Sequence, residues 1–86
     1  VDQVAGIVGA LCSGAAIAAA NSVAIPADVV MISPSATSPE ITNLDDNDTF
    51  FRVAPSDAYQ GQVLADYVLD NGFDRVALTY INNDYG

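Results

Sequence analysis

The chain of 86 residues contains no lysine, no histidine and no tryptophan, and it has a single cysteine. A Walker A phosphate loop needs lysine, and a catalytic serine usually needs histidine or lysine as its base. Zinc sites are built mainly from several cysteine and histidine ligands, which this composition does not supply. The sequence therefore predicts that this segment is no enzyme, needs no cofactor and holds no metal.

Positive charge is almost as scarce. Arg52 and Arg75 stand against eleven acidic residues, and the formal net charge is −9. Nucleic acids and anionic membrane surfaces attract basic surfaces, so we expect neither as a partner. No apolar run approaches the length of a membrane-spanning helix. Hydrophobic residues nevertheless make up 51% of the chain, which is typical of a folded domain and not of a disordered one.

Two strand–turn–helix units open the chain. Val4–Gly9 has the pattern of a buried strand, and the alanine-rich stretch Gly14–Ser22 predicts a helix. Val29–Ile32 predicts a second strand, and Ser38–Asn43 predicts a short second helix. Strands that alternate with helices form parallel sheets, so the sequence predicts an α/β fold with parallel, Rossmann-like layers.

The second half of the chain repeats this alternation. Phe50–Val53 predicts a third strand, and a long helix capped by Ser56 or Asp57 follows and runs to Asn71, where Gly72 stops it in the left-handed conformation. Arg75–Ile81 is almost wholly apolar and predicts a last strand covered on both faces. The long helix also carries an apolar stripe that we expect in the core, formed by Tyr59, Val63, Leu64, Tyr67 and Val68.

The turn after the second strand is rich in hydroxyl groups. Thr37 and Glu40 have the spacing of a capping box, and Pro39 suits a first helical turn. Such a turn directs hydroxyls and unpaired backbone N–H groups at one spot, which makes a carboxylate or phosphate site without lysine or arginine. Ser13 begins the preceding helix, and both turns should lie at the sheet edge where α/β folds bind ligands. The alternative is an ordinary helix cap.

Four segments in this order resemble the type I periplasmic binding proteins. The closest resemblance is to the branched-chain amino-acid receptor group of ABC transporters, and it extends from Val4 to Gly86. The segments are Leu11-Cys12-Ser13-Gly14, Met31–Glu40, Phe51–Gly61 and Asn83-Asp84-Tyr85-Gly86.

The resemblance implies a two-lobed receptor with its ligand cleft between the lobes. Because 86 residues are too few for two lobes, we expect this chain to be an internal fragment. Residues 1–54 would belong to lobe one, with the first crossover strand at 50–53, and residues 55–86 would begin lobe two. From the residues alone, 50–53 is one more strand of a single sheet.

The resemblance further implies an extracytoplasmic solute receptor, periplasmic or lipid-anchored, that binds a small amino acid of branched-chain type and delivers it to a membrane permease. Ser13 and Thr37 would supply hydroxyl groups, while Ser35, Ala36 and Thr37 would supply backbone groups to the ligand carboxylate. Tyr85 would close over the ligand as an amphipathic wall. The acid that binds the ligand ammonium group would lie beyond the end of this chain. The alternative is a ligand-sensing domain of a signalling receptor, or an amide-type regulator, on the same fold.

Cys12, Asp28 and the open sheet lead to three smaller expectations. Cys12 is either a small buried residue in a packed turn or, as the resemblance implies, one half of a disulfide whose partner precedes this chain. Asp28 stands where relatives often have glycine, so we expect a strained turn there. A truncated sheet leaves apolar faces and strand edges open, and we therefore expect the chain by itself to form a homodimer.

Overall fold

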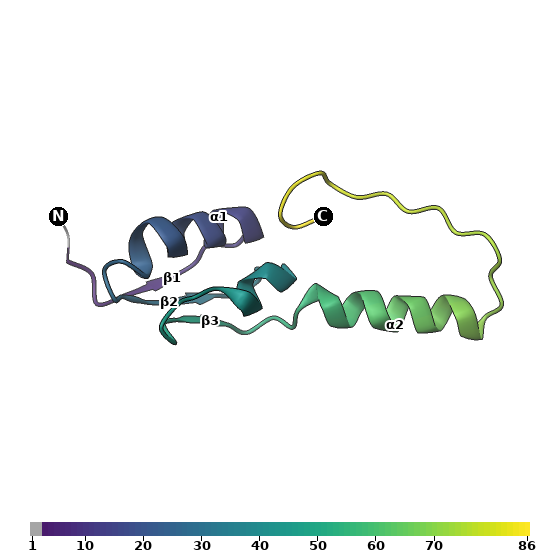
Figure 1. The fold of residues 1–86 in the computed structure, drawn as a ribbon, viewed down its shortest axis with the longest axis horizontal. Coiled ribbons are helices and arrows are strands. Elements are labelled where there is room, and N and C mark those ends of the chain that lie inside the picture. The colour runs from purple at the N-terminus through teal and green to yellow at the C-terminus, as the bar shows by residue number, and fades with distance from the viewer. Residues whose placement is uncertain (1–2) are drawn as a thin grey trace.

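The computed structural model describes residues 3–86, so residues 1 and 2 of the expected lobe-one range lie outside the described part. Strands and helices alternate along the chain, as the sequence predicts (Figure 1). The molecule is elongated, 55 × 22 × 19 Å, because its second half extends away from the sheet. The elements are β1 (Gly6–Val8), α1 (Ser13–Ala19), a π-helical turn η1 (Ala20–Ala24), β2 (Val30–Ser33), a 3-10 helix η2 (Pro39–Asn43), β3 (Phe50–Arg52) and α2 (Asp57–Asp70).

The three strands form one parallel sheet in the order β1-β2-β3. Gly6 pairs with Val30, and Met31 pairs with Phe50, so β2 is the central strand. The α/β class and the parallel sheet are therefore confirmed. The strand β3 pairs with β2 in the same sheet, as the residues alone predict for this segment.

The core lies between the sheet and the helix that follows β1. Ala16, Ala20 and Ala24 repeat every fourth residue and present one small, fully buried face to the sheet. Met31 of β2 is buried beneath this face, whereas its neighbours Val30 and Ile32 point to the other face and remain exposed. One face of the sheet is thus covered and the other is open, which is only half of the burial that a parallel sheet normally has.

The long helix begins and ends where the sequence predicts. The Ser56 hydroxyl accepts a hydrogen bond from the Ala58 N–H at 3.3 Å and caps the first turn. At the other end Gly72 has φ of 68°. The Phe73 N–H donates to the Val68 carbonyl, and the Gly72 N–H donates to the Leu69 carbonyl. These bonds form a Schellman motif, so the prediction of a left-handed glycine stop is confirmed.

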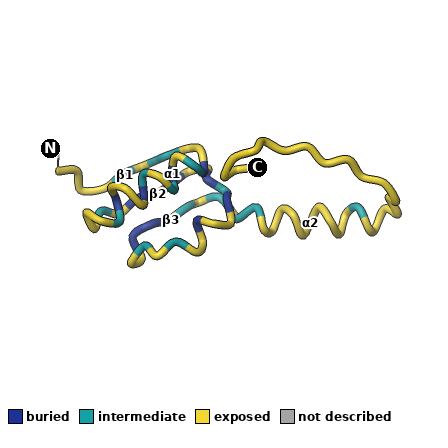
Figure 2. The backbone as a smooth tube through the Cα atoms, turned by 45° about the horizontal axis from the view of Figure 1, so that its top comes forward, coloured by how far each residue is buried: buried dark blue, intermediate teal, exposed yellow. Residues whose placement is uncertain are grey.

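Two expectations about the second half of the chain are wrong. None of the α2 residues is buried, so the apolar stripe of α2 is not core in this chain (Figure 2). Arg75–Ile81 is extended but is not a strand, and it is exposed throughout. A strand needs a neighbour for its backbone hydrogen bonds, and the C-terminal segment 73–86 runs back alongside α2, so that only its last residues come near the turns at the edge of the sheet (Figure 1).

The turn residues Asp28 and Cys12 test two further expectations. Asp28 has φ of 53°, which is left-handed, as the comparison with glycine predicts. Cys12 is exposed and its thiol is free, so the expectation of a small buried residue is wrong. Its expected disulfide remains a prediction.

Candidate functional site

The turns after β1 and β2 lie against each other at the carboxyl edge of the sheet. The Ser33 hydroxyl donates to the Ala10 carbonyl at 2.6 Å, and the Ser35 hydroxyl donates to the Leu11 carbonyl at 2.8 Å. Both bonds join residues that are more than twenty positions apart in sequence. The two hydroxyl-rich turns therefore meet at one edge, where the parallel arrangement predicts that they should meet.

Ser13 lies at the centre of this meeting point. Its side chain is 1% exposed, and its Oγ accepts hydrogen bonds from the backbone N–H groups of Thr37 at 3.2 Å and Ser38 at 3.1 Å. The Ala36 N–H donates to the Ser33 hydroxyl at 3.0 Å, and Ala36 is itself 1% exposed. The N–H groups of Ala36 and Thr37 are thus paired within the chain, whereas the sequence predicts that such groups are unpaired.

The predicted capping box is also wrong by one residue. Ser38, not Thr37, caps η2, because the Ser38 hydroxyl accepts from the Glu40 N–H at 3.3 Å. The Thr37 hydroxyl instead donates to Oδ2 of Asp57 at 2.6 Å, and the Asp57 N–H donates to the Thr37 carbonyl at 2.9 Å. These two hydrogen bonds link the turn after β2 to the first turn of α2. From the sequence alone Asp57 has only a capping role, and nothing in the sequence indicates its contact with Thr37.

Arg52, at the end of β3, is the second residue that sequence reasoning missed. One of its terminal nitrogens, Nη1, donates to the Ser38 carbonyl at 2.7 Å and to the Ala36 carbonyl at 3.5 Å. The other, Nη2, donates to the Thr42 hydroxyl. All three acceptors are uncharged and belong to the segment between β2 and β3. A single guanidinium group thus links three residues of this segment to the end of β3.

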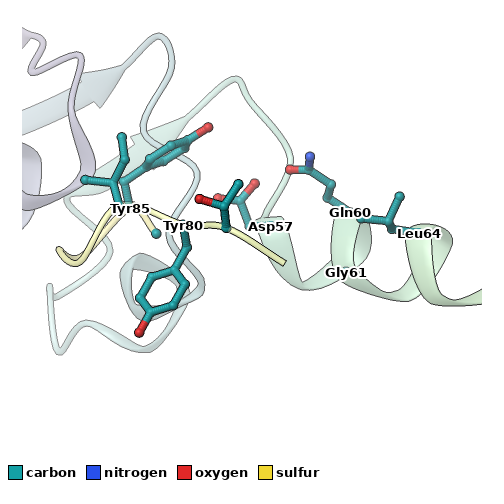
Figure 3. A pocket seen from close by; sticks show the side chains of 9 residues that line it. Asp57, Gln60, Gly61, Leu64, Tyr80 and Tyr85 are labelled. Atoms are coloured by element: carbon teal, nitrogen blue, oxygen red, sulfur yellow. The ribbon is translucent and has the colours of Figure 1, made fainter. Parts of the chain in front are cut away.

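The C-terminal segment brings Tyr85 to the same edge. A hollow of about 350 Å³ lies between this segment and the two turns, and its wall includes Ser13, Ser35 and Tyr85. A second hollow of about 480 Å³ lies between the C-terminal segment and the start of α2, and its wall includes Asp57 and Tyr85 (Figure 3). Tyr85 is 55% exposed and borders both hollows, so it stands between the turn and α2.

The structure thus separates the predicted site residues into three positions. Ser13, Ser35 and Tyr85 border one hollow, Thr37 faces Asp57 beside the next, and Ala36 is buried beneath the turn. Thr37 and Asp57 share a hollow of about 380 Å³ at the beginning of α2. The Thr37 hydroxyl is thus in contact with the Asp57 carboxylate, and Tyr85 borders both the hollow beside Asp57 and the hollow beside Ser35.

Neither a metal-ion cluster nor a membrane-spanning helix is present in residues 3–86. Within this range, no cluster of three histidine, cysteine or acidic side chains has the geometry to hold a metal ion. Within the same range, no helix combines the length and the apolar character that crossing a membrane requires.

The chain as a whole is similar to a family of known receptors. A family model described as "Receptor family ligand binding region" matches residues 1–86. Metabotropic glutamate receptor 8 of Homo sapiens is 33% identical over 85 residues, which are 99% of this chain and 9% of the receptor. Metabotropic glutamate receptor 6 of Oryctolagus cuniculus is 34% identical over 85 residues, 99% of this chain and 10% of the receptor.

The chain thus spans about a tenth of the length of these curated relatives. Because they are glutamate receptors, they support the expected receptor superfamily but give no support to the branched-chain transport group within it. The whole of the chain matches the family model, so the chain belongs to the family described as the receptor family ligand binding region.

Proposed function

We propose that the chain is part of an extracytoplasmic receptor domain that senses a small α-amino acid. The observation that carries this proposal is the convergence of Ser35, Thr37, Asp57 and Tyr85 at one edge, in a chain whose relatives are glutamate receptors. An α-amino acid carries a carboxylate and an ammonium group at a fixed spacing. Hydroxyl donors beside a carboxylate acceptor match both groups.

The ligand carboxylate is assigned to the hydroxyl-rich turn. The Ser35 side chain is exposed, and its hydroxyl borders the hollow beneath Tyr85. The Thr37 hydroxyl now donates to Asp57, so it becomes available only when another donor replaces it there. An incoming ammonium group is such a donor, because it carries three N–H bonds and a positive charge. The Thr37 hydroxyl then turns to the ligand carboxylate.

The ligand ammonium group is assigned to Asp57. Its carboxylate is half-buried at the first turn of α2, and it borders both hollows next to α2. The aromatic ring of Tyr85 lies on the other side of the larger hollow (Figure 3), where it can contact a cation through its face. The acid that the resemblance places beyond the end of the chain thus has a counterpart within it.

The lobe assignment and the location belong to the same proposal. The expected boundary between residues 54 and 55 falls in the short connection that separates β3 from α2. A ligand held between Thr37 and Asp57 would contact both sides of this connection. The receptor reading also implies an extracytoplasmic position, with signalling as the favoured output and branched-chain amino-acid transport through a permease as the alternative.

Titration calorimetry on the full-length protein tests the proposal. The panel contains L-glutamate, L-leucine, and for each its α-amide and its decarboxylated amine. We expect binding of at least one L-amino acid, and a loss of affinity of about ten- to a hundredfold when the α-carboxylate is removed, since a hydrogen bond to a charged group contributes roughly 1.5–3 kcal/mol. Preference for glutamate supports the sensing reading, and preference for leucine supports the transport alternative.

Asp57→Asn provides the matched test of the ammonium site. We expect it to lower amino-acid affinity at least tenfold, because it removes the negative charge that faces the ammonium group. The control is Ser56→Ala, which removes the neighbouring helix cap and should lower stability by about 1 kcal/mol without changing affinity. Full affinity in Asp57→Asn, or no binding of any amino acid by the wild-type protein, would contradict the proposal.

A further inference from the structure

The guanidinium group of Arg52 contacts the backbone on both sides of Thr37. Its Nη1 atom donates to the carbonyl groups of Ala36 and Ser38, which are the residues on either side of Thr37. Its Nη2 atom donates to the Thr42 hydroxyl in η2. The planar fork of arginine can reach such a set of acceptors simultaneously, whereas the point charge of lysine cannot.

The peptide group between Ala36 and Thr37 is held from both sides. Its carbonyl accepts from Arg52, and its N–H donates to the buried Ser13 hydroxyl at 3.2 Å. Both polar groups of this peptide therefore have partners, although the Arg52 contact, at 3.5 Å, is the longer one. The orientation of the peptide group sets the direction of the Thr37 side chain. The Arg52 contact comes from β3, and the Ser13 contact comes from α1, so two separate elements fix one peptide plane.

We propose that Arg52 is a positioning residue for carboxylate recognition. It does not touch the ligand but orients Thr37 so that its hydroxyl can exchange between Asp57 and the ligand carboxylate. This inference rests on the proposed function for the ligand, but the ordering of the turn by Arg52 stands on the hydrogen bonds alone. Arg75 offers a matched control, since it is exposed and lies in the C-terminal segment away from the turn.

The first experiment compares Arg52→Gln with Arg75→Gln in the full-length protein, because both remove one positive charge. The ligands are L-glutamate or L-leucine, whichever the wild type binds, and the corresponding α-amide. We expect Arg52→Gln to lose about tenfold in affinity for the amino acid and less than twofold for the amide. Arg75→Gln should leave both affinities unchanged, and Arg52→Lys should recover only part of the loss.

The second experiment needs no ligand. Hydrogen exchange of the Thr37 and Ser38 amides, both bonded to Ser13, should become at least tenfold faster in Arg52→Gln and stay at the wild-type rate in Arg75→Gln. Unchanged exchange in Arg52→Gln would overturn the inference. Equal loss of affinity for amino acid and amide would also overturn it, because it would indicate a general structural role. A wild type that binds no amino acid would refute the proposed function, and the exchange rates would still decide the role of Arg52 in ordering the turn.

Discussion

The hydrogen bond between Thr37 and Asp57 allows a sharp test, because it is the link between the turn and α2. A double-mutant cycle uses Thr37→Ala, Asp57→Asn and the variant with both changes. The Oγ1–Oδ2 distance of 2.6 Å is short, as expected for a hydroxyl that donates to a carboxylate. Hydrogen bonds to charged groups contribute roughly 1.5–3 kcal/mol, and half exposure of Asp57 places this bond at the lower end of that range.

The cycle separates this bond from other effects of the same residues. Asp57→Asn also removes a negative charge from the first turn of α2, which costs about 0.3–1 kcal/mol whether or not Thr37 is present. Thr37→Ala leaves the η2 cap intact, because Ser38 makes that cap. We therefore expect the single changes to be non-additive, with a coupling energy of about 1 kcal/mol.

Urea denaturation followed by circular dichroism measures the coupling, and the ligand affinity of the same variants provides a second readout. Ser38→Ala is the control, since it should lower stability by about 1 kcal/mol through loss of the cap and leave affinity unchanged. Thr37→Ala should lower affinity about ten- to a hundredfold. If the two changes are additive to within about 0.3 kcal/mol, or if Thr37→Ala binds ligand like the wild type, the roles given to Thr37 are wrong.

Three further predictions concern stability and assembly. Gly72→Ala should destabilise α2 by about 1 kcal/mol because φ is 68° there, whereas Gly61→Ala in the helix interior should stabilise it by a similar amount, and melting curves would show shifts of opposite sign. Asp28→Gly should raise the melting temperature, because Asp28 has φ of 53° and glycine adopts that conformation at lower cost; an unchanged or lower value would contradict the strain. By itself the 86-residue chain, whose sheet has one open face and whose α2 stripe is exposed, should dimerise, and light scattering that finds only monomer at high concentration would refute this.

The first half of the fold could be predicted from the sequence because its signals are local. The alternation of apolar strands with an alanine-rich helix predicts β1, α1 and β2. The glycine after α2 likewise predicts its stop, since only local hydrogen bonds form the motif. Arg75–Ile81 has an equally strong local pattern but lacks a neighbouring strand. Without such a neighbour its backbone cannot form the hydrogen bonds of a sheet.

The candidate site was predictable in composition but not in connectivity. Thr37 and Ser38 are adjacent hydroxyl residues, and local spacing favours Thr37 as the cap. The choice is reversed by Asp57, which is twenty positions away and accepts from Thr37, so that the cap is left to Ser38. The same applies to Arg52, because its three acceptors converge only after the segment between β2 and β3 has folded.

These bonds also indicate how a ligand would act on the chain. In the structure, the Thr37 hydroxyl is paired with Asp57, and its N–H is paired with Ser13. A ligand that binds here must therefore replace an existing hydrogen bond, so its affinity depends on the difference between the two bonds. Because the replaced bond links the turn to α2, the same exchange changes how the sheet and α2 are joined. Binding and a rearrangement at the connection between β3 and α2 would then be one event, as a sensing domain requires.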